Sequence, residues 1–554
     1  MMTNALRTAA LQAMDARFDP AEQMLWGKVS TAGYHTKLTA GSPTHLVLEA
    51  FQYALDSLAT EEPQRCERGV SVLRRVLSLQ VTDPTEPAYG VWPWSMEEPV
   101  PMMAPPDWNW ADFCGFRLAT IVRNSSHLLP ADLAAHARAA LHRAAWCVFR
   151  RNVQPSYTNI AIMGGGFTAA AGEILGQPAL VEYGRRRLQN CVASAEYQGG
   201  FNEYNSPTYT TVVIAECDRT LNLVQDEQTR AAAERLRYLA WQTVAESFHP
   251  ATQQWAGPHS RTYGDYISVA AAEFLSRQTG VAIKPHPRAA AGTVDTLDQR
   301  PCPEDLKPRF AALPSNPLSL RRRFQRREPD TASTYGTTWH GGNACLGTVN
   351  DDTFWIQRRP ILGYWRSDAD PANVLRVRML HDGNDFASGV ARTAQAGPDA
   401  LSIFTLTTNK GDHHDHLDRP ADGLFKISSL KIRVELSGNG AKLEPLNGSA
   451  FRLVAGPTCA VVVAGPSCFD GKPATVVSGA ADGVAWVDIV FYGGPARAFR
   501  FTDLVEAWAT MALSVQPIDR PTIPSIRNRD VDGNVLEVAS GDLMVDAQKR
   551  PQPR

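Results

Sequence analysis

The stretch of sequence that decides the fold is residues 282–318, which read AIKPHPRAAAGTVDTLDQRPCPEDLKPRFAALPSNPL. It holds seven prolines and little hydrophobic periodicity, which is typical of a linker that wraps between domains. Before this stretch the apolar residues recur at helical spacing, and after it they alternate with a period of two. The chain is therefore predicted to divide into a domain at 1–281, a linker at 282–318 and a domain at 319–554.

The first part is predicted to be a run of helical hairpins. Ser42 and Pro43 are typical of a helix cap and its first turn, and Asp226 is typical of the start of a later helix. Apolar stripes predict further helices at 66–80, 110–128, 158–175, 178–195, 207–224 and 265–279. The glycines at 164–166 do not follow a strand and lack nucleotide-binding spacing, so they are interpreted as sites of close helix packing.

The last part is predicted to be a large antiparallel β domain. Candidate strands are 353–357, 361–366, 374–379, 401–407, 431–436, 451–454, 460–463 and 484–492, separated by turn residues such as Asp470-Gly471. The polar, Pro-rich tail at 548–554 is expected to be frayed.

Composition excludes several classes of protein. The content of 44% hydrophobic and 20% charged residues is that of a globular protein, and a formal charge of -2 gives no overall attraction to nucleic acid. Nine scattered cysteines without a C-x-x-C pair favour reduced thiols over a disulfide framework. The N-terminus lacks an apolar signal core, so a cytoplasmic protein is expected, or a periplasmic or secreted one if a signal was removed.

Two polar-aromatic segments interrupt the helical pattern. Residues 199–209 read GGFNEYNSPTY, and residues 255–266 read WAGPHSRTYGDY. Together they concentrate groups that move protons and hold an anionic sugar, so they are predicted to form an active site.

The segments 157–159, 201–209 and 259–266 resemble motifs of uronate-specific polysaccharide lyases. Those alginate, heparin and glucuronan lyases combine an α/α toroid with an antiparallel β domain, and the resemblance is greatest to the glucuronan and alginate lyases. It implies an α+β fold, with an incomplete α/α toroid of helical hairpins followed by an antiparallel β-sandwich. It also implies a carbon–oxygen lyase that cleaves a uronate-containing glycan by β-elimination.

The chemistry of that reaction suggests a role for each residue type. Asn159 and Glu203 would neutralise the substrate carboxylate, because the enediolate intermediate concentrates negative charge there. Arg261 would orient the substrate and polarise a tyrosine. The proton would be moved by a set of candidates whose members remain open, namely Tyr209, Tyr263 and Tyr266, with His259 as the alternative base.

Neighbouring residues extend the candidate site. Tyr204 and Asn205 are expected to contact the substrate. Four tryptophans in the segment 88–113 would stack on sugar rings or, alternatively, plug one end of the helical domain: Trp92, Trp94, Trp108 and Trp110. A purely structural interpretation is the alternative, in which the tyrosines and asparagines fill loop turns and Arg261 pairs with Asp265.

A third cluster lies in the β half. If its segment is extended, His414 and His416 project to one face with Asp412 and suit a divalent metal such as zinc or calcium. The segment resembles a His-x-His-x-Asp stretch of heparinase-type β domains, and a solvated turn is the alternative. The elimination itself requires no cofactor.

Three functions remain in competition. The first is the lyase acting on an acidic oligo- or polysaccharide, with no nucleic-acid or membrane partner and with homo-oligomerisation left open. The second is a glycoside hydrolase that uses two carboxylates among Asp107, Asp112, Glu203 and Asp265. The third is a carbohydrate-binding protein without turnover.

Overall fold

The computed structural model describes residues 4–29, 35–292, 299–519 and 521–554. The chain forms two compact units, and each unit is built from three separate stretches of the sequence. The helical unit comprises Met1–Glu196, Val212–Ala240 and Val294–Pro301, and the sandwich unit comprises Tyr197–Thr211, Trp241–Thr293 and Cys302–Arg554. The boundaries expected at residues 282 and 318 stay a prediction, and residues 293–298 of the expected linker lie outside the described residues.

The helices follow the predicted segments closely. They are α1 Asn4–Asp15, α2 Val47–Leu58, α3 Pro63–Leu77, α4 Asn109–Ser125, α5 Ala131–Arg151, α6 Thr158–Leu175, α7 Pro178–Gln198, α8 Tyr209–Leu223, α9 Glu227–Ser247, α10 Val269–Thr279 and α11 Pro308–Ala311. Asp226 does start α9, since its carboxylate accepts hydrogen bonds from the backbone N–H (2.9 Å) and hydroxyl (2.7 Å) of Thr229.

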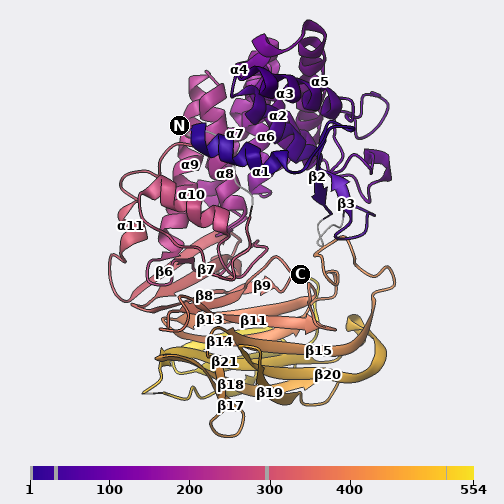
Figure 1. Ribbon diagram of the computed structural model, residues 1–554. Helices are drawn as coiled ribbons and strands as arrows, with labels where there is room; N and C mark the ends of the chain where they lie inside the picture. Colours follow the sequence, from indigo (N-terminus) through magenta and orange to yellow (C-terminus); the bar gives the residue numbers. More distant parts are fainter. Residues whose placement is uncertain (1–3, 30–34, 293–298, 520) are drawn as a thin grey trace. The chain divides into compact units, whose positions relative to one another are not determined.

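Within the helical unit the helices alternate between an inner and an outer position. Helix α2 packs on α3 and α4, while α4 packs in turn on α5 and α6. The inner helix α6 is buried around most of its circumference, whereas α3 and α5 bury only one stripe. Pairs of antiparallel helices in this order form an incomplete α/α toroid, so the expected fold class is confirmed (Figure 1).

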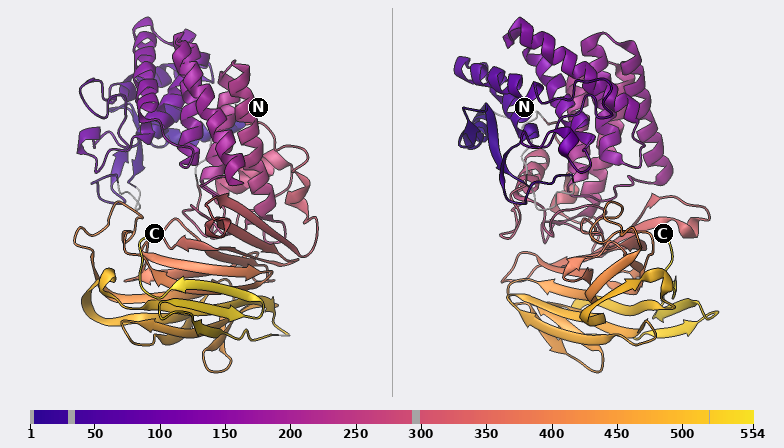
Figure 2. Two further views of the ribbon diagram at one scale, coloured as in Figure 1. Left: turned by 180° about the vertical axis from the view of Figure 1, so that it is seen from behind. Right: turned by 90° about the vertical axis from the view of Figure 1, so that its right-hand side faces the viewer.

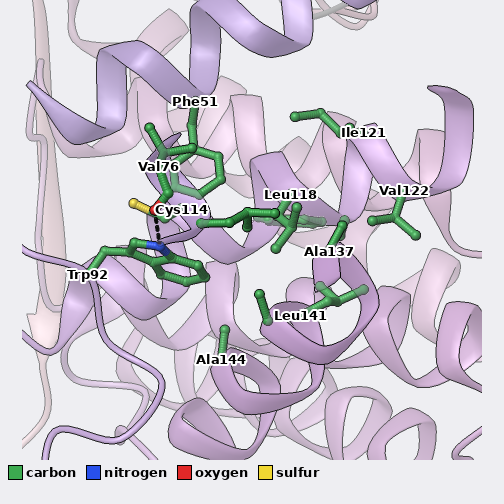
Figure 3. Close-up of a cluster of buried hydrophobic side chains, with 14 of the residues drawn as sticks. Phe51, Val76, Trp92, Cys114, Leu118, Ile121, Val122, Ala137, Leu141 and Ala144 are labelled. Atoms are coloured by element: carbon green, nitrogen blue, oxygen red, sulfur yellow. Dashed lines mark hydrogen bonds between the residues drawn. The ribbon is translucent and has the colours of Figure 1, made fainter. Parts of the chain in front are cut away.

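Small residues allow this close packing. A Cβ added at Gly164 would lie 2.7 Å from a carboxylate oxygen of Asp112, and one at Gly166 would lie 2.0 Å from the Thr220 hydroxyl. The interpretation of residues 164–166 as packing glycines is confirmed. Figure 3 shows the core of this unit, where the aliphatic side chains of α4 and α5 meet.

One expected helix start is wrong. Pro43 belongs to strand β3 Pro43–His45, which pairs with β2 Met24–Lys28, and α2 begins only at Val47. The Glu97 carboxylate accepts hydrogen bonds from the hydroxyl of Thr44 and from the backbone N–H of His45 (3.0 Å), and these contacts hold the segment extended. A pairing partner far along the sequence thus overrode the local capping signal.

The sandwich unit contains two large antiparallel sheets (Figure 2). The nine-stranded sheet has the order β19-β20-β15-β11-β10-β8-β7-β6, with β12 beside β11, and the seven-stranded sheet has the order β16-β17-β18-β21-β14-β13-β9. Side chains of both sheets form one apolar core, to which Ile432 and Phe425 contribute from the first sheet and Phe404 and Met511 from the second. This arrangement confirms the predicted antiparallel β-sandwich.

The strands have the following bounds. They are β1 Phe18–Asp19, β4 Phe248–His249, β5 Gln254–Trp255, β6 Leu318–Gln325, β7 Thr334–His340, β8 Ala344–Val349, β9 Asp351–Thr353, β10 Ile361–Trp365, β11 Asn373–His381, β12 Asn384–Asp385, β13 Gly389–Ala396, β14 Asp399–Leu406, β15 Leu424–Ser437, β16 Lys442–Pro445, β17 Ala450–Ala455, β18 Thr458–Phe469, β19 Thr475–Ala481, β20 Val484–Arg500, β21 Ala507–Pro517, β22 Arg527–Asp530, β23 Val535–Ser540 and β24 Leu543–Gln548.

Two expectations for this half are wrong. The segment 353–357 is not a strand, because β9 ends at Thr353 and the chain then turns through residues 354–360. The tail at 548–554 is held in place, because Thr407 forms a parallel bridge with Gln552 and Arg554 pairs with Asp351 at 3.0 Å. Long-range partners again decide both outcomes.

Two further observations concern composition. All nine cysteines are free thiols. Among the described residues, none of the helices is both long enough and apolar enough to span a membrane.

Candidate active site

The two polar-aromatic segments are fastened together inside the sandwich unit by Asn205. Its backbone adopts φ +48°, a conformation that Asn tolerates well. Its side-chain amide donates to the carbonyls of Ala256 and Pro258, both at 2.8 Å, and its side-chain oxygen accepts from the Trp255 indole. Asn205 is buried, so the structure assigns it to holding the loops, although the sequence predicted a substrate contact.

His259 extends this fastening. The ring Nδ1 lies 2.9 Å from the carbonyl oxygen of Asn205 and therefore donates to it, and the backbone of His259 pairs with that of Arg359. The side chain is buried, and this burial lowers the pKa of His259 to about 4. A neutral, enclosed imidazole with one nitrogen committed to the backbone suits a loop-positioning role better than that of a base.

Arg261 is the centre of the resulting cluster. Its guanidinium donates to a carboxylate oxygen of Glu203 at 2.7 Å, to the hydroxyl of Tyr209 at 3.0 Å and to the side-chain oxygen of Gln357 at 2.9 Å. Its carbon Cζ also lies 4.0 Å from the centre of the Tyr209 ring. This fork geometry fixes a positive charge against a phenol oxygen, which stabilises negative charge on that oxygen.

Tyr209 and Tyr263 form a hydroxyl pair beside that guanidinium. Their phenol oxygens are 2.7 Å apart, which is the length of a good O–H···O hydrogen bond. Tyr263 is 56% exposed, so this end of the cluster faces solvent. The backbone N–H of Tyr209 donates to the Ser206 hydroxyl at 2.9 Å, which caps α8 and fixes the position of the tyrosine. Two phenols in contact with each other, one of which also contacts the guanidinium, provide a proton path that opens to solvent.

The loop at 354–360 supplies members that the sequence analysis missed. Gln357 is buried and accepts from Arg261, while its carbonyl accepts from the backbone N–H of Thr262 at 2.7 Å. The ring of Trp355 contacts both Arg261 and Arg358, whose Cζ atoms are each 5.4 Å from its centre. The sequence pattern at 353–357 predicted a strand, so it gave no indication of a loop that contributes to a site.

His414 reaches the same cluster through Trp355. The two rings meet edge to face, with centres 5.0 Å apart. Nδ1 of His414 accepts from the backbone N–H groups of His416 (2.9 Å) and Leu417 (3.1 Å), so its proton lies on Nε2. Burial lowers the pKa of His414, which favours this neutral form.

The predicted metal set is not assembled around a common point. The segment at 411–418 is turned, with the Asp418 carboxylate accepting from the backbone N–H of Asp412 (3.1 Å) and His413 (2.7 Å). Asp412 pairs with His381 at 2.8 Å, while His416 lies 3.5 Å from the Lys410 ammonium. Across the described ranges, no three His, Cys, Asp or Glu side chains are grouped so that they could hold a metal ion.

Three predicted residues of the segments are committed to packing or ion pairs. Tyr204 stacks on Phe324 with ring centres 4.4 Å apart, and burial raises the pKa of this tyrosine well above its ordinary value. Tyr266 stacks on His286 at 3.8 Å, and burial raises its pKa as well. Asp265 pairs with Arg359 and Arg376, and not with Arg261 as the purely structural interpretation predicted.

The remaining predicted residues belong to the helical unit. Asn159 is fully buried near the start of α6. Trp92 is also fully buried, donates its indole N–H to the Val76 carbonyl at 3.0 Å and meets Phe51 edge to face (Figure 3). A sugar ring has no access to it there. Trp94 and Trp110 are half-buried with ring centres 5.1 Å apart, and Trp108 packs against the same core.

The carboxylates required by the hydrolase alternative are either enclosed or paired. In the helical unit, burial raises the pKa of Asp112 to about 7, although Arg187 and Arg151 oppose the shift. Asp107 accepts from the Trp94 indole at 3.0 Å. In the sandwich unit, Glu203 and Asp265 each pair with arginine. No two of the four form an open acid–base pair within either described unit.

Comparison with known proteins places the chain in a family. It belongs to the family described as Domain of unknown function (DUF8769), whose model matches residues 4–291, just over half of the 554 residues. None of the curated proteins matches the chain.

Solved structures of polysaccharide lyases are among those with a similar topology. A heparinase III is 11% identical, with 91% of this chain and 82% of that chain covered and a TM-score of 0.42. A mutant heparan sulfate lyase from Pedobacter heparinus is 9% identical, with 99% and 94% covered and a TM-score of 0.36. A likeness at this level identifies neither the activity nor the substrate of this chain.

Proposed function

We propose that this protein is a polysaccharide lyase that cleaves a uronate-containing glycan, such as alginate or glucuronan, by β-elimination. The observation that carries the proposal is the contact of Arg261 with Tyr209, whose hydroxyl lies 2.7 Å from that of Tyr263. A cation that donates directly to a phenol oxygen is the arrangement that lets a tyrosine take up and return a proton near neutral pH.

The reaction assigns a step to each member of the cluster. Tyr209, as the phenolate, removes the proton from the sugar carbon next to the carboxylate. A carbon–carbon double bond then forms, and the bond from the neighbouring carbon to the glycosidic oxygen breaks. The proton returns to this leaving oxygen from Tyr209 or through Tyr263, so that no water is consumed.

Arg261 and its partners position the charge for these steps. Glu203 and Gln357 hold two nitrogens of the guanidinium, which leaves it fixed beside Tyr209 before substrate binds. The Glu203 carboxylate is engaged by the Arg261 guanidinium at 2.7 Å, so we assign to it the positioning of Arg261 in place of the predicted neutralisation of the substrate. The neutralising role of Asn159 and the substrate contacts of Trp94, Trp108 and Trp110 stay predictions from the sequence.

The chemistry of the cluster favours this function over hydrolysis. A hydrolase requires two carboxyl groups that face the scissile bond, one of them protonated. Glu203 is instead engaged by Arg261, whereas the exposed groups of the cluster are phenols.

The test is an assay of ultraviolet absorbance on polyuronate oligomers, because elimination creates a conjugated double bond. Wild-type protein is expected to give rising absorbance, and Tyr209→Phe and Arg261→Ala are expected to slow this rise strongly. Tyr492→Phe is a matched control, because the Tyr492 hydroxyl donates to the Pro495 carbonyl at 2.6 Å and takes no part in the Arg261 cluster. Release of reducing ends without absorbance would contradict the proposal, as would full activity of Arg261→Ala.

A further inference from the structure

A second feature of the sandwich unit is an arginine-rich segment that is separate from the Arg261 cluster. Residues 321–330 read RRRFQRREPD, with five arginines and two acidic residues in a chain whose formal charge is -2. They run from β6 into the turn that leads to β7, and β6 is an edge strand of the nine-stranded sheet (Figure 1). The local field is therefore positive where the overall charge is nearly balanced.

The pairing register sorts these arginines between the two faces of β6. Arg321 lies opposite Thr337, and Arg323 lies opposite Tyr335, so their side chains share one face of the sheet. Arg322 and Phe324 point to the other face, where Arg322 pairs with Glu246 and Phe324 stacks on Tyr204. The first face thus presents arginine and tyrosine side by side.

Arg321 has an unusual environment for a surface arginine. Its Cζ lies 3.8 Å from the centre of the Tyr335 ring, so the planar guanidinium is stacked on the phenol. Stacking leaves the N–H groups free at the edge of the plane, in the fork that matches a carboxylate or sulfate. Within the described parts of the chain, no carboxylate lies within ion-pair distance of Arg321 or of Arg327, and both side chains are exposed.

The neighbouring arginines repeat this arrangement. Arg326 lies over the ring of Tyr197 at 4.9 Å, and Tyr197 is itself largely exposed. Gln198 holds the two parts together, because its carbonyl accepts from Arg323 at 3.0 Å and its side-chain oxygen accepts from the backbone N–H of Arg326 at 2.5 Å. Arg326 and Arg323 pair with Glu328 and Asp330 on the surface, and such exposed pairs are weak enough to be exchanged for a ligand.

We propose that this surface, the arginine strip formed by Tyr197, Arg321, Arg323, Arg326, Arg327 and Tyr335, binds an acidic polysaccharide chain. The planar arginine forks would hold carboxylate or sulfate groups, and the tyrosine rings would lie against sugar faces. The identity of the ligand as a polyuronate rests on the proposed function.

The connection to the catalytic cluster favours a glycan over a nucleic acid as the occupant. Tyr197 and Glu203 are six residues apart, so their Cα atoms can be separated by no more than about 22 Å. One polymer several sugars long can therefore contact the strip and the Arg261 cluster together. Such a contact retains a long substrate between successive cleavages.

The experiment measures binding without turnover. Electrophoresis of the Tyr209→Phe protein through gels that contain alginate should show strong retardation, and the double variant R321Q/R327Q in the same background should lose affinity at least about five-fold. R326Q, which removes the arginine over Tyr197, is a second variant with a smaller expected loss. R497Q is the matched control, because Arg497 is also exposed and lies over an aromatic ring, that of Phe499 at 4.7 Å.

The outcomes separate this proposal from the proposed function. Unchanged retardation of R321Q/R327Q, or an equal loss in R497Q, would overturn the strip whether or not the protein is a lyase. Equal retardation by neutral dextran or by polyadenylate would overturn recognition of an acidic glycan. A third outcome is that the wild type shows no elimination activity, while only R321Q/R327Q and R326Q lose affinity. That result would overturn the proposed function but still support glycan binding by the arginine strip.

Discussion

The two halves of the segment 259–266 each carry a charged residue and a tyrosine, but in opposite surroundings. At the first end, Arg261 and Tyr263 join Tyr209 in a cluster that opens to solvent. At the other end, Asp265 is held by two arginines and Tyr266 is stacked on His286. A hydroxyl pair beside an arginine is suited to proton transfer, whereas a carboxylate held by two arginines stabilises the fold. Residue type alone does not distinguish a catalytic role from a structural one. The hydrogen-bond and ion-pair partners of each polar atom make that distinction.

The largest expected effect lies at the first end. Tyr209→Phe removes the hydroxyl that contacts both Arg261 and Tyr263, and it should reduce kcat on polyuronate about 10³-fold, within the range typical of a lost acid–base group. Steady-state absorbance assays measure this loss, and the melting temperature should stay close to that of the wild type. A reduction smaller than about ten-fold would remove Tyr209 from the proton-transfer step.

The next effect lies at the other end and concerns stability. Asp265→Ala leaves Arg359 and Arg376 without their shared carboxylate in a largely buried site, which should lower the free energy of unfolding by about 3 kcal/mol. Urea denaturation measures the change. Asp265→Asn keeps the shape and one acceptor and should lose less. If both variants unfold like the wild type, the network is not what holds this end of the segment.

A smaller effect is expected on the pH dependence of stability, and it comes from His259. The pKa of folded His259 is about 4, below the unfolded value of about 6.5, so the unfolded state binds more protons between these values. The stabilisation is full above pH 6.5 and is lost as the pH falls toward 4. Between pH 7.5 and 5, the wild type should lose about 2 kcal/mol more than His259→Gln. Parallel urea curves for the two proteins at both pH values would show instead that His259 protonates without cost.

The smallest effect is expected for Tyr266. Its ring packs on His286 and the substitution keeps that ring, so Tyr266→Phe should change the free energy of unfolding by less than about 1 kcal/mol. Its activity should stay within about two-fold of the wild type, in contrast to Tyr209→Phe. Calorimetry and the absorbance assay provide the two measurements. A large loss of activity here would erase the distinction between the two ends.

Local sequence signals predicted much of the fold. The stripe of apolar residues predicted α6 at 158–175, and alternation predicted strands such as β10 and β17. Pro43 and the segment 353–357 were misassigned because their conformations depend on distant partners, such as the Glu97 carboxylate that holds Thr44 and His45. A pattern that spans a few residues cannot contain that information.

The candidate site was predictable only in part, for the same reason. Glu203, Tyr209, Arg261 and Tyr263 lie in two segments whose composition already indicated a site, and the structure brings them together. Gln357 and Trp355 come from a loop about 100 residues further along the chain, and neither has a local signature that marks it. Trp92 is buried in the core, in agreement with the second of the two roles considered for the tryptophans, and the loop sequence alone did not distinguish the two.

The most direct measurement of the central claim is the mass balance of cleavage. A defined polyuronate oligomer is digested by the wild-type protein, and all products are weighed by mass spectrometry. Elimination predicts that the product masses add up to the mass of the oligomer, with one product carrying the new double bond. A sum that exceeds the oligomer by one water would contradict the account, because the Arg261 cluster would then serve hydrolysis.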